Sequence, residues 1–593
     1  MSYPFFSNHL YLYAMKKNML FFRLFHGLLG SLILVSGLIF QSAHAQIDPY
    51  HYTISKRAVG TTGAVSSAHP LASQVGVEIL KKGGNAFDAA IATQLALAVV
   101  YPNAGNIGGG GFLVAHTRQG KAIAIDYREK APGSASRDMY LDAAGNPLLN
   151  LSQFGHLASG VPGTVAGLFA SHAYAKLPFH ELIAPAIALA EKGFVITASE
   201  ARSLNGNKAS FVKYNTVQPV FVKTDSWKEG DTLVQKELAA TLKRIQDNGK
   251  KGFYEGETAE LIVAEMKRGG GKISLNDLKS YEAAIRQPVV FDYKGHTVIG
   301  MPMPSSGGLL MQQMMKMIEN RNISAMGFHS PEAVQLMVEV ERRAYADRAE
   351  FMGDQDFVKV PVKTLSGDAY LKSRMNDFIP GKATPSSQIK PGNVNPESEE
   401  TTHLSVADAE GNIVSVTTTL NGGYGSKTVV GGAGFFLNNE MDDFSVKPGV
   451  ANMYGAIGKE ANAIAPGKRM LSSMTPTLVL KNKKPWLVVG TPGGTTIPTS
   501  VFQTLVNIIE FNQSAQDAVN NPKFHHQWLP DQVMVENDFP KEVQKKLSSM
   551  GYELVNRGQI GRTEVIRLEW QGRKIKSIEA IADKRGDDHA AAY

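Results

Sequence analysis

The stretch TTHLSVADAEGNIVSVTTTLN, residues 401–421, contains the pattern that decides the fold. Two alternating runs flank the turn-forming segment DAEGN, which predicts a β-hairpin. If the loop has three residues, with Gly411 in the left-handed conformation, Thr401 lies opposite Thr419, whereas a longer loop shifts that register. Opposed Cβ atoms are about 4.5–5.5 Å apart, so the two hydroxyls are expected within hydrogen-bonding reach.

A polar segment directly precedes this hairpin. Residues 378–400, FIPGKATPSSQIKPGNVNPESEE, are rich in Pro, Ser, Lys and Glu and lack hydrophobic periodicity, which predicts an exposed linker. Threonines in a strand are explained by β-propensity alone. A strand that begins at a threonine directly after a long exposed linker is, however, how an N-terminal-nucleophile hydrolase looks before self-cleavage. We therefore place a boundary between Glu400 and Thr401, with segments 46–400 and 401–593 on its two sides.

Composition bounds the class of protein. The chain has 593 residues, 43% hydrophobic and 19% charged, which predicts a globular protein with several packed layers. It has no cysteine, so disulfides, thiol nucleophiles and zinc–thiolate sites are excluded. The net charge of +7 includes three basic residues and no acid within residues 1–45, which leaves +4 for the rest. No run of basic residues interleaved with aromatics stands out, so no nucleic-acid partner is predicted.

The first 45 residues resemble an export signal. Basic residues Lys16, Lys17 and Arg23 precede the apolar run 25–40, and Ala-His-Ala at 43–45 fits a cleavage site. The alternative is a retained membrane anchor, but the apolar run is short for a membrane span and contains polar residues. We expect a signal peptide at 1–45 and a periplasmic or secreted protein without membrane association afterwards. Three methionines are candidate starts of translation: Met1, Met15 and Met19.

Elsewhere the periodicity predicts mostly helices before the linker and mostly strands after it. An almost wholly apolar helix is expected at 85–101, and the glycine-rich loop 105–111 follows it. This loop lacks the spacing of a phosphate-binding loop and follows a helix, so it predicts close backbone packing rather than nucleotide binding. The other expected elements are strands at 112–116 and 122–127 and helices at 163–174, 180–192, 258–268 and 331–350.

Long ordered motifs resemble the γ-glutamyltransferase family over nearly the whole chain after residue 45. Besides 401–421, they are GNIGGGGFLV (105–114), AIDYREKAP (124–132), SGVPGTVAG (159–167), ERRAYADRAEF (341–351), LNNEMDDFSVKPG (437–449), KRMLSSMTPTLV (468–479), VVGTPGG (488–494) and FHHQWLP (524–530). The resemblance implies an α+β fold, the four-layer αββα sandwich of N-terminal-nucleophile hydrolases. It also implies a heterodimer of large and small subunits cut from one precursor.

The resemblance further implies a role for each candidate residue. Thr401 is the nucleophile of self-cleavage and of turnover, Thr419 hydrogen-bonds its hydroxyl, and Tyr454 belongs to a lid loop at 448–459. The other implied roles are the oxyanion hole, at the backbone N–H groups of Gly493 and Gly494; the α-carboxylate site, at Arg128, Ser472 and Ser473; and the α-ammonium site, at Asn421, Glu440 and Asp443. Glu440 stands where some bacterial members have Gln, and its charge still suits an ammonium group.

The chemistry explains this set of residue types. A γ-glutamyl group has a zwitterionic head, so its pocket needs a cation and an anion, and a guanidinium offers a carboxylate paired donors. A hydroxyl nucleophile needs a base, and the freed α-amine of Thr401, with a reference pKa of roughly 7.7–8.0, is the nearest one. Adjacent glycines bring backbone donors to the oxyanion, worth roughly 3–4 kcal/mol per donor. The expected donors are glutathione and glutamine, the acceptors are water, amino acids or dipeptides, and neither a metal nor an organic cofactor is needed.

Taken one at a time, these motifs have simpler explanations. Asp442 and Asp443 suit a helix cap, the Ser and Gly pairs suit turns, and Arg128 suits a salt bridge to a neighbouring acid. His525 and His526 are interpreted as structural because neighbouring side chains on an extended chain point apart. Two rival functions remain. A cephalosporin acylase on the same scaffold would not need an ammonium site, and a processed but inactive binding protein would not need the intact threonine and glycine set.

Overall fold

The computed structural model describes residues 1, 47–389 and 401–593. The chain divides into Met1–Asp48 and Pro49–Tyr593, and the fold is that of the second unit. The predicted signal peptide, apart from Met1, and Glu400 lie outside the described residues. Among the helices that are described, none has both the length and the apolar character that a membrane span requires.

The predicted hairpin is present with the predicted register. Strands β10 (Thr402–Ala407) and β11 (Ile413–Thr419) pair antiparallel, with Thr402 opposite Thr418. Gly411 has a φ of 85°, as the three-residue loop requires. The Asp408 carboxylate accepts hydrogen bonds from the backbone N–H groups of Glu410, within this loop, and Asn412, directly after it, at 2.9 and 3.0 Å. Local turn chemistry therefore places Thr401 across from the end of β11.

This hairpin lies at the centre of the first of two seven-stranded sheets. The strand order of the first sheet is β19-β2-β10-β11-β3-β4-β7. The flanking strands are β2 (Ala64–Ser67), β3 (Gly110–His116), β4 (Ala122–Asp126), β7 (Ala284–Arg286) and β19 (His589–Ala592). Strands from before and after residue 400 are therefore interleaved within one hydrogen-bonded sheet.

The second sheet mixes the two segments in the same way. Its order is β1-β18-β17-β13-β12-β9-β8. The strands are β1 (Arg57–Gly60), β8 (Val289–Tyr293), β9 (His296–Gly300), β12 (Thr477–Lys481), β13 (Lys484–Gly490), β17 (Glu564–Gln571) and β18 (Lys574–Ile581). The two sheets pack face to face through β10, β11 and β13.

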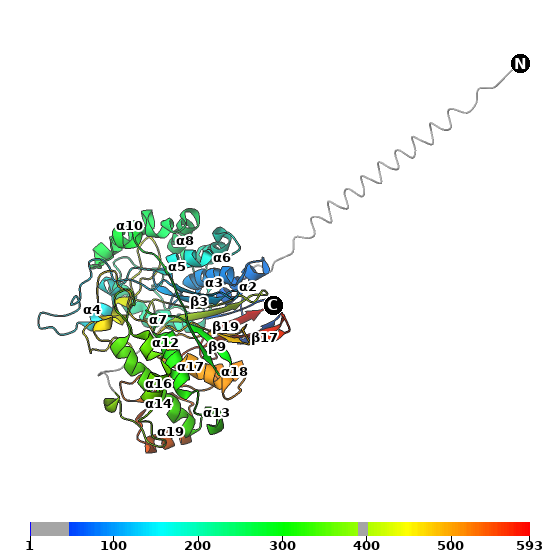
Figure 1. Ribbon diagram of the computed structural model, residues 1–593. Coiled ribbons are helices and arrows are strands. Elements are labelled where there is room, and N and C mark those ends of the chain that lie inside the picture. Colours follow the sequence, from blue (N-terminus) through cyan, green and yellow to red (C-terminus); the bar gives the residue numbers. More distant parts are fainter. Residues whose placement is uncertain (2–46, 390–400) are drawn as a thin grey trace. The chain divides into compact units, whose positions relative to one another are not determined.

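Helices cover the outer face of each sheet (Figure 1). The first sheet is covered by α2 (Pro70–Lys81), α3 (Ala86–Val100) and α5 (Thr164–His172), with α6 (Phe179–Lys192) packed on α3. The second is covered by α12 (Gly307–Ile318) and α17 (Thr496–Ile509), with α14 (Pro331–Phe351) packed on α12. The predicted four-layer αββα sandwich is confirmed. Every residue of α3 is buried because a sheet and other helices enclose it, which explains why its sequence is apolar on all sides.

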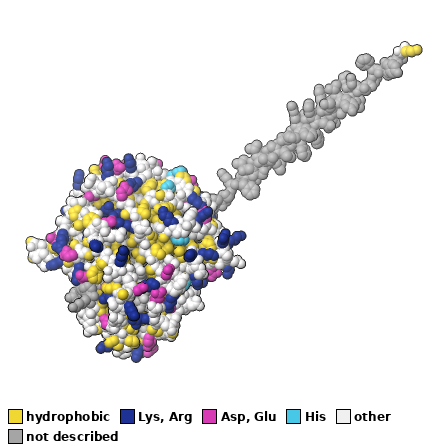
Figure 2. Space-filling model, viewed as in Figure 1, with side chains coloured by type: hydrophobic (Ala, Val, Ile, Leu, Met, Phe, Trp, Pro, Cys, Tyr) yellow, Lys and Arg dark blue, Asp and Glu magenta, His cyan; other side chains and the backbone are white. Residues whose placement is uncertain are grey.

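The remaining described strands lie outside the two large sheets, in a three-stranded sheet β14-β15-β16 and a two-stranded sheet β5-β6. The other helices are α4 (Leu149–Gln153), α7 (Ala198–Tyr214), α8 (Lys236–Asn248), α9 (Lys251–Tyr254), α10 (Gly256–Gly269), α11 (Leu275–Lys279), α13 (Ile323–Met326), α15 (Val362–Leu365), α16 (Asp368–Arg374), α18 (Ala515–Asn520) and α19 (Lys541–Ser549). The short strands are β5 (Phe194–Val195), β6 (Thr232–Leu233), β14 (Phe524–His525), β15 (Val533–Glu536) and β16 (Leu554–Gly558). On the face shown in Figure 2, basic and acidic side chains are interspersed.

The glycine-rich loop packs by its backbone, as predicted. A Cβ on Gly109 would lie 2.0 Å from the carbonyl oxygen of Thr419, and one on Gly108 would lie 2.2 Å from that of Phe436. Real Cβ atoms do not approach so closely, so side chains are excluded at both positions. The loop therefore lies directly against the end of β11, where Thr419 stands.

Candidate active site

Thr401 and Thr419 face each other at the end of the hairpin. Their Oγ1 atoms are 3.5 Å apart, and Thr401 is 4% exposed. The backbone N–H of Asn421 donates to Thr419 Oγ1 at 2.8 Å. Because that bond occupies a lone pair of the oxygen, the Thr419 hydroxyl proton remains available for Thr401 Oγ1.

Asn106, which the sequence reasoning missed, holds this end of β11 in place. Its Nδ2 donates to the carbonyl oxygen of Thr419 at 2.9 Å and to Thr418 Oγ1 at 3.3 Å. Its Oδ1 accepts from the Gly109 N–H at 3.0 Å and from the Thr164 hydroxyl at 2.7 Å. The sequence feature that could have indicated Asn106 is its place inside the glycine-rich loop, where a polar side chain must satisfy closely packed backbone groups.

The hairpin face that carries these threonines is polar, although it points toward the second sheet. His403 Nδ1 lies 3.0 Å from Thr417 Oγ1, and its Nε2 lies 3.1 Å from Ser405 Oγ. Burial lowers the pKa of His403 to about 3, so the ring is neutral. The polar side chains are thus hydrogen-bonded within the sandwich, and His403 is structural.

Gly493 and Gly494 lie between the end of β13 and the start of α17. Both have positive φ, 137° and 51°. The N–H of Thr496 donates to the Gly493 carbonyl at 2.9 Å, so the two glycines form the approach to the helix N-terminus. This end of a helix favours negative charge. A Cβ on Gly494 would lie 2.9 Å from Tyr454 Cδ1, which places the aromatic ring directly over it.

Nearly all predicted site residues line one small cavity, which we call the inner cavity. Gly493 is the exception, because it lines a larger neighbouring cavity that also includes Thr401. Glu400 lies outside the described residues. The residues that line the inner cavity are Arg128, Arg348, Thr401, Thr419, Asn421, Glu440, Asp443, Asn452, Tyr454, Ala456, Ser472, Ser473, Met474, Gly494, Thr495 and Ile497.

Arg128, just after β4, joins the two predicted ammonium-binding acids directly. Its Nη1 lies 2.5 Å from Glu440 Oε1, and its Nη2 donates to Asp443 Oδ2. Glu129 is also within 3.6 Å. The Arg128 side chain is 1% exposed, and burial alone would lower its pKa, but these carboxylates raise it above the usual value. The simpler interpretation, a salt bridge to a neighbouring acid, therefore describes the contacts that Arg128 makes here.

The acids around Arg128 outnumber it, and burial disfavours their charge. Burial raises the pKa of Glu129 to about 8 and raises the pKa values of Glu440 and Asp443, although Arg128 opposes all three shifts. Glu440 Oε2 is buried and has no hydrogen-bond partner among the described residues. The lining of the cavity therefore includes a carboxyl oxygen that a bound hydrogen-bond donor, such as an ammonium group, can satisfy.

Arg348, on α14, is a second guanidinium of the inner cavity, and the sequence reasoning did not assign it. Its Nη2 donates to Ser473 Oγ at 3.0 Å, and its Nε donates to Ser306 Oγ at 3.1 Å. The Ser306 hydroxyl in turn donates to the Ser472 carbonyl oxygen at 2.8 Å. Arg348 therefore fixes the turn that presents the two serines. The sequence feature that could have indicated Arg348 is its place within the motif at 341–351.

Tyr454 and its loop close over the inner cavity. Asn452 Nδ2 donates to Asp443 Oδ1 at 2.9 Å, and the Met453 N–H donates to Asp442 Oδ2 at 2.7 Å. Ser152 also donates to Asp442, and burial raises the pKa of this carboxyl to about 7. Asp442, which by sequence alone suits a helix cap, thus anchors the lid loop.

The two adjacent histidines are buried in a hydrogen-bonded network away from this cavity. His525 Nδ1 lies 2.8 Å from Thr499 Oγ1, and His526 Nδ1 accepts from the Trp528 N–H at 3.0 Å. Burial lowers their pKa values to about 3 and about 4. Both rings are neutral packing elements.

Two antiparallel sheets between helical layers, with a threonine at the start of an inner strand, define the class of N-terminal-nucleophile hydrolases. A family model described as gamma-glutamyltranspeptidase matches residues 72–593, and the chain belongs to this family. The glutathione hydrolase proenzyme of Escherichia coli (strain K12) is 45% identical over 94% of this chain and 98% of its own length. The chain is therefore an enzyme of the gamma-glutamyltranspeptidase and glutathione hydrolase type.

Solved structures agree with this assignment. Cephalosporin acylase from Bacillus halodurans matches with a TM-score of 0.79 at 26% identity, over 93% of this chain and 99% of that one. Gamma-glutamyltranspeptidase from Helicobacter pylori matches with a TM-score of 0.54 at 48% identity, over 55% of this chain and 94% of that one. The fold is thus shared with an acylase, and substrate recognition must be argued from the site.

Proposed function

We propose that the chain is a precursor that cleaves itself between Glu400 and Thr401. The products, 46–400 and 401–593, then form a heterodimer that transfers γ-glutamyl groups. The observation that carries this proposal is the 3.5 Å approach of Thr401 Oγ1 and Thr419 Oγ1 beside the cavity that contains Arg128 and Asp443. Separate elements of the fold supply the proposed nucleophile, the charged side chains that would bind the donor's head group, and the glycine N–H donors.

The first half-reaction forms an ester on Thr401. The freed α-amine of Thr401 takes the hydroxyl proton, and Oγ1 attacks the γ-carbonyl carbon of glutathione or another γ-glutamyl donor. The backbone N–H groups of Gly493 and Gly494 stabilise the oxyanion, and the Thr419 hydroxyl orients Thr401 Oγ1. The C–N bond then breaks, and the leaving amine takes the proton. In the second half-reaction, water or an acceptor amine attacks the ester by the same steps.

The inner cavity would bind the donor's zwitterionic head. Arg128 with Ser472 and Ser473 would hold its α-carboxylate; Asn421, Glu440 and Asp443 would hold its α-ammonium group. When the head binds, its α-carboxylate would pair with Arg128 and its α-ammonium group with Asp443, in place of the direct contact between these two side chains. Because every buried charge keeps a counter-charge, this exchange avoids the large penalty of an unpaired ion.

Several features support the heterodimer and the export. Both sheets contain strands from both segments, paired with each other, so a cut at residue 400 leaves the segments joined by backbone hydrogen bonds. The N-terminal pattern supports removal of residues 1–45 and a periplasmic or secreted enzyme. N-terminal sequencing of the larger product from an exported fraction should start at Gln46.

The test of this function is the Thr401→Ala variant beside wild type. Wild type should give two chains, the smaller starting Thr401-Thr402-His403, and should release p-nitroaniline from γ-glutamyl-p-nitroanilide. The variant should remain one chain without activity, because the hydroxyl that attacks in both reactions is gone. Cleavage of Thr401→Ala at the same bond would show that Thr401 is not the nucleophile.

A further inference from the structure

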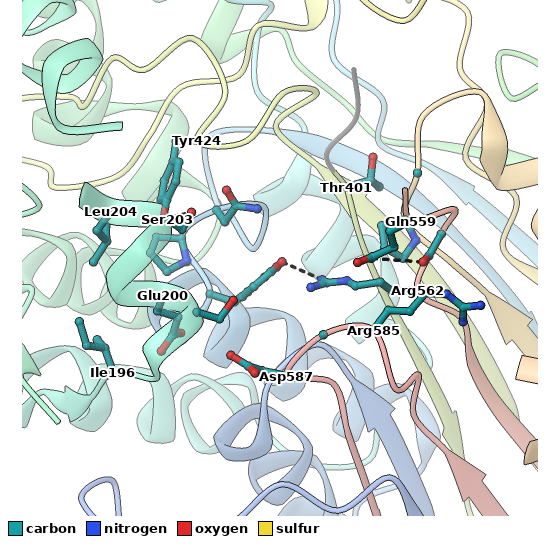
Figure 3. A pocket seen from close by; sticks show the side chains of 18 of the residues that line it. Ile196, Glu200, Ser203, Leu204, Thr401, Tyr424, Gln559, Arg562, Arg585 and Asp587 are labelled. Carbon is teal, nitrogen blue, oxygen red and sulfur yellow. Dashed lines mark hydrogen bonds between the residues drawn. The ribbon is translucent and has the colours of Figure 1, made fainter. Parts of the chain in front are cut away.

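The lid loop at 448–459 covers the inner cavity and not the larger cavity on the other side of Thr401. Asn452, Tyr454 and Ala456 line the inner cavity. Figure 3 shows the larger cavity, with Thr401 among its lining residues; of the residues that the structure describes, none from the lid loop lines it. The position of the lid loop therefore acts on the cavity that would hold the donor's head.

Met453, in the middle of the lid loop, places its sulfur against two side-chain amides. The Sδ atom lies 3.3 Å from Nδ2 of Asn439 and 3.7 Å from Nδ2 of Asn421. A Cβ on Gly422 would lie 3.2 Å from the methyl carbon of Met453, so the glycine leaves the space that this side chain fills. Met453 thus joins the lid loop to the two segments that carry these asparagines.

The sulfur accepts one of the two N–H groups of each amide. Nδ2 of Asn421 also donates to the Asn439 carbonyl oxygen at 3.0 Å, and Nδ2 of Asn439 also donates to the Gln153 carbonyl oxygen at 3.0 Å. With two acceptors for its Nδ2, the Asn421 amide has a fixed orientation. Its acceptor atom, Oδ1, is then the atom that an α-ammonium group can use. Met453 therefore orients one of the proposed ammonium ligands.

Displacement of Met453 would also affect the acids of the inner cavity. The Met453 N–H donates to Asp442 Oδ2 at 2.7 Å, and the preceding residue, Asn452, donates to Asp443 Oδ1 at 2.9 Å. Because Asp443 is a proposed ammonium ligand as well, the lid contacts at residues 452 and 453 connect to both sides of the ammonium site. A change at the Met453 sulfur should therefore alter binding of the donor.

The thioether of Met453 is a group that a peroxide can modify. The chain has no cysteine to compete for an oxidant, and Met453 is half-buried, so a small oxidant can reach this side chain. Hydrogen peroxide transfers one oxygen atom to the sulfur: the O–O bond breaks, an S–O bond forms, the thioether is oxidised to a sulfoxide, and the peroxide is reduced to water.

The sulfoxide does not fit the position that the thioether occupies. The new oxygen takes a lone-pair position of the sulfur, and the amide N–H groups of Asn439 and Asn421 point toward the sulfur there. A separation of 3.3 Å between Sδ and Nδ2 of Asn439 leaves no room for another atom in a close-packed contact. The oxidised side chain must therefore leave these two amides.

We propose that Met453 is an oxidisable latch that holds the lid loop on the donor site. The reduced thioether keeps the lid loop on Asn421 and Asn439, whereas the sulfoxide displaces it and weakens binding of the donor's head. Enzymatic reduction of the sulfoxide resets the latch. This inference rests on the proposed γ-glutamyl transfer, and it adds a modification site to it.

The test treats the mature enzyme with hydrogen peroxide, removes the peroxide, and makes two measurements. Mass spectrometry gives the sulfoxide content at residue 453, and p-nitroaniline release from γ-glutamyl-p-nitroanilide gives KM and kcat. We expect the donor KM to rise about 10-fold as the sulfoxide accumulates, with a smaller change in kcat, because the latch acts on binding and not on the reacting atoms. Methionine sulfoxide reductases should restore the original KM, which damage elsewhere would not allow.

Two variants assign the effect to one sulfur. Met453→Leu keeps a side chain of similar volume that cannot form a sulfoxide. Its KM before treatment should rise no more than about threefold, since a thioether is a weak acceptor, and peroxide should then leave it unchanged. The matched control is Met326→Leu, which removes a half-buried methionine on α13, outside the lining of the inner cavity. This variant should respond to peroxide as wild type does.

Three results would overturn the latch. They are sulfoxide at residue 326 of wild type with none at 453, an unchanged KM when residue 453 is fully oxidised, and equal peroxide sensitivity of Met453→Leu and wild type. Failure of the proposed function gives a different result, because untreated wild type would then release no p-nitroaniline at all.

Discussion

Gly109 lies so close to Thr419 that a Cβ on the glycine would be 2.0 Å from the threonine's carbonyl oxygen. The same carbonyl accepts a hydrogen bond from Asn106 at 2.9 Å. The glycine-rich loop therefore sets the position of the hydroxyl that faces the proposed nucleophile. Glycine is required at 109 because no side chain fits between the two backbones.

Gly109→Ala should slow both self-cleavage and turnover, because the added methyl displaces Thr419 from Thr401. The matched control is Gly206→Ala in α7, where a Cβ meets nothing within 4 Å. Precursor and product bands on a denaturing gel, followed over time, measure the first effect, and p-nitroaniline release measures the second. Equal maturation rates for the two variants would contradict the positioning role of the loop.

Thr419→Ala should also impair both reactions, here through loss of the hydroxyl and not through displacement. Thr419→Ser keeps that hydroxyl and should retain most of the activity. Loss of one hydrogen bond to the reacting oxygen predicts a decrease in kcat of about 10-fold or more. If Thr419→Ala matures and turns over at wild-type rates, the 3.5 Å approach has no catalytic role.

Recognition of the zwitterionic head separates the transferase from the acylase alternative. Arg128→Lys keeps the charge but loses paired donors, so γ-glutamyl turnover should fall substantially. Asp443→Ala leaves the α-ammonium partly unpaired, at a cost of roughly 2–5 kcal/mol. The measurement is kcat/KM for γ-glutamyl and glutaryl anilides on wild type and both variants.

A glutaryl donor has no ammonium, so wild type should use it poorly, and Asp443→Ala should affect it much less. Two results would favour the acylase alternative: a wild-type preference for glutaryl, or an equal loss for both donors in Asp443→Ala.

Arg348→Gln tests the residue that the sequence reasoning did not assign. Removing the guanidinium breaks the bonds to Ser473 and Ser306, so the turn that presents the carboxylate-binding serines should loosen. We expect the donor KM to rise about 10-fold with a smaller change in kcat, because the residue acts on binding and not on the reacting atoms. Arg348→Lys should recover part of the loss. A reduced kcat with an unchanged KM would argue against this positioning role.

The raised pKa of the Asp442 carboxyl predicts a specific pH dependence of stability. Burial raises its pKa from 3.8 to about 7, so the folded protein holds a proton that the unfolded chain has lost between these values. The free energy of unfolding therefore contains a contribution that falls as pH rises through this window. Asp442→Asn removes that contribution and keeps an acceptor for the Met453 N–H. The Tm of the variant relative to wild type should accordingly increase from pH 5 to pH 8, and a constant difference would contradict the pKa shift.

Several features of this protein follow from local chemistry in the sequence alone. The register that places Thr401 across from Thr419 depends on a turn of a few residues with Gly411 at positive φ, so it could be predicted from the hairpin segment. The helix at 85–101 was also predictable, and the structure has it as α3 with Asn85 and Tyr101 as its caps. Ordered motifs then indicated the family and most of the residues that line the inner cavity.

What the sequence by itself determined is thus the set of short-range elements and the identity of the reactive residues. The tertiary structure alone decided which distant groups meet: Arg128 with Glu440 and Asp443, Arg348 with Ser473, and Arg562 with Tyr101. The physical reason is sequence separation. A hairpin register is fixed by the geometry of its own turn, whereas contacts between residues hundreds of positions apart exist only once two interleaved sheets and their helices have packed into one sandwich.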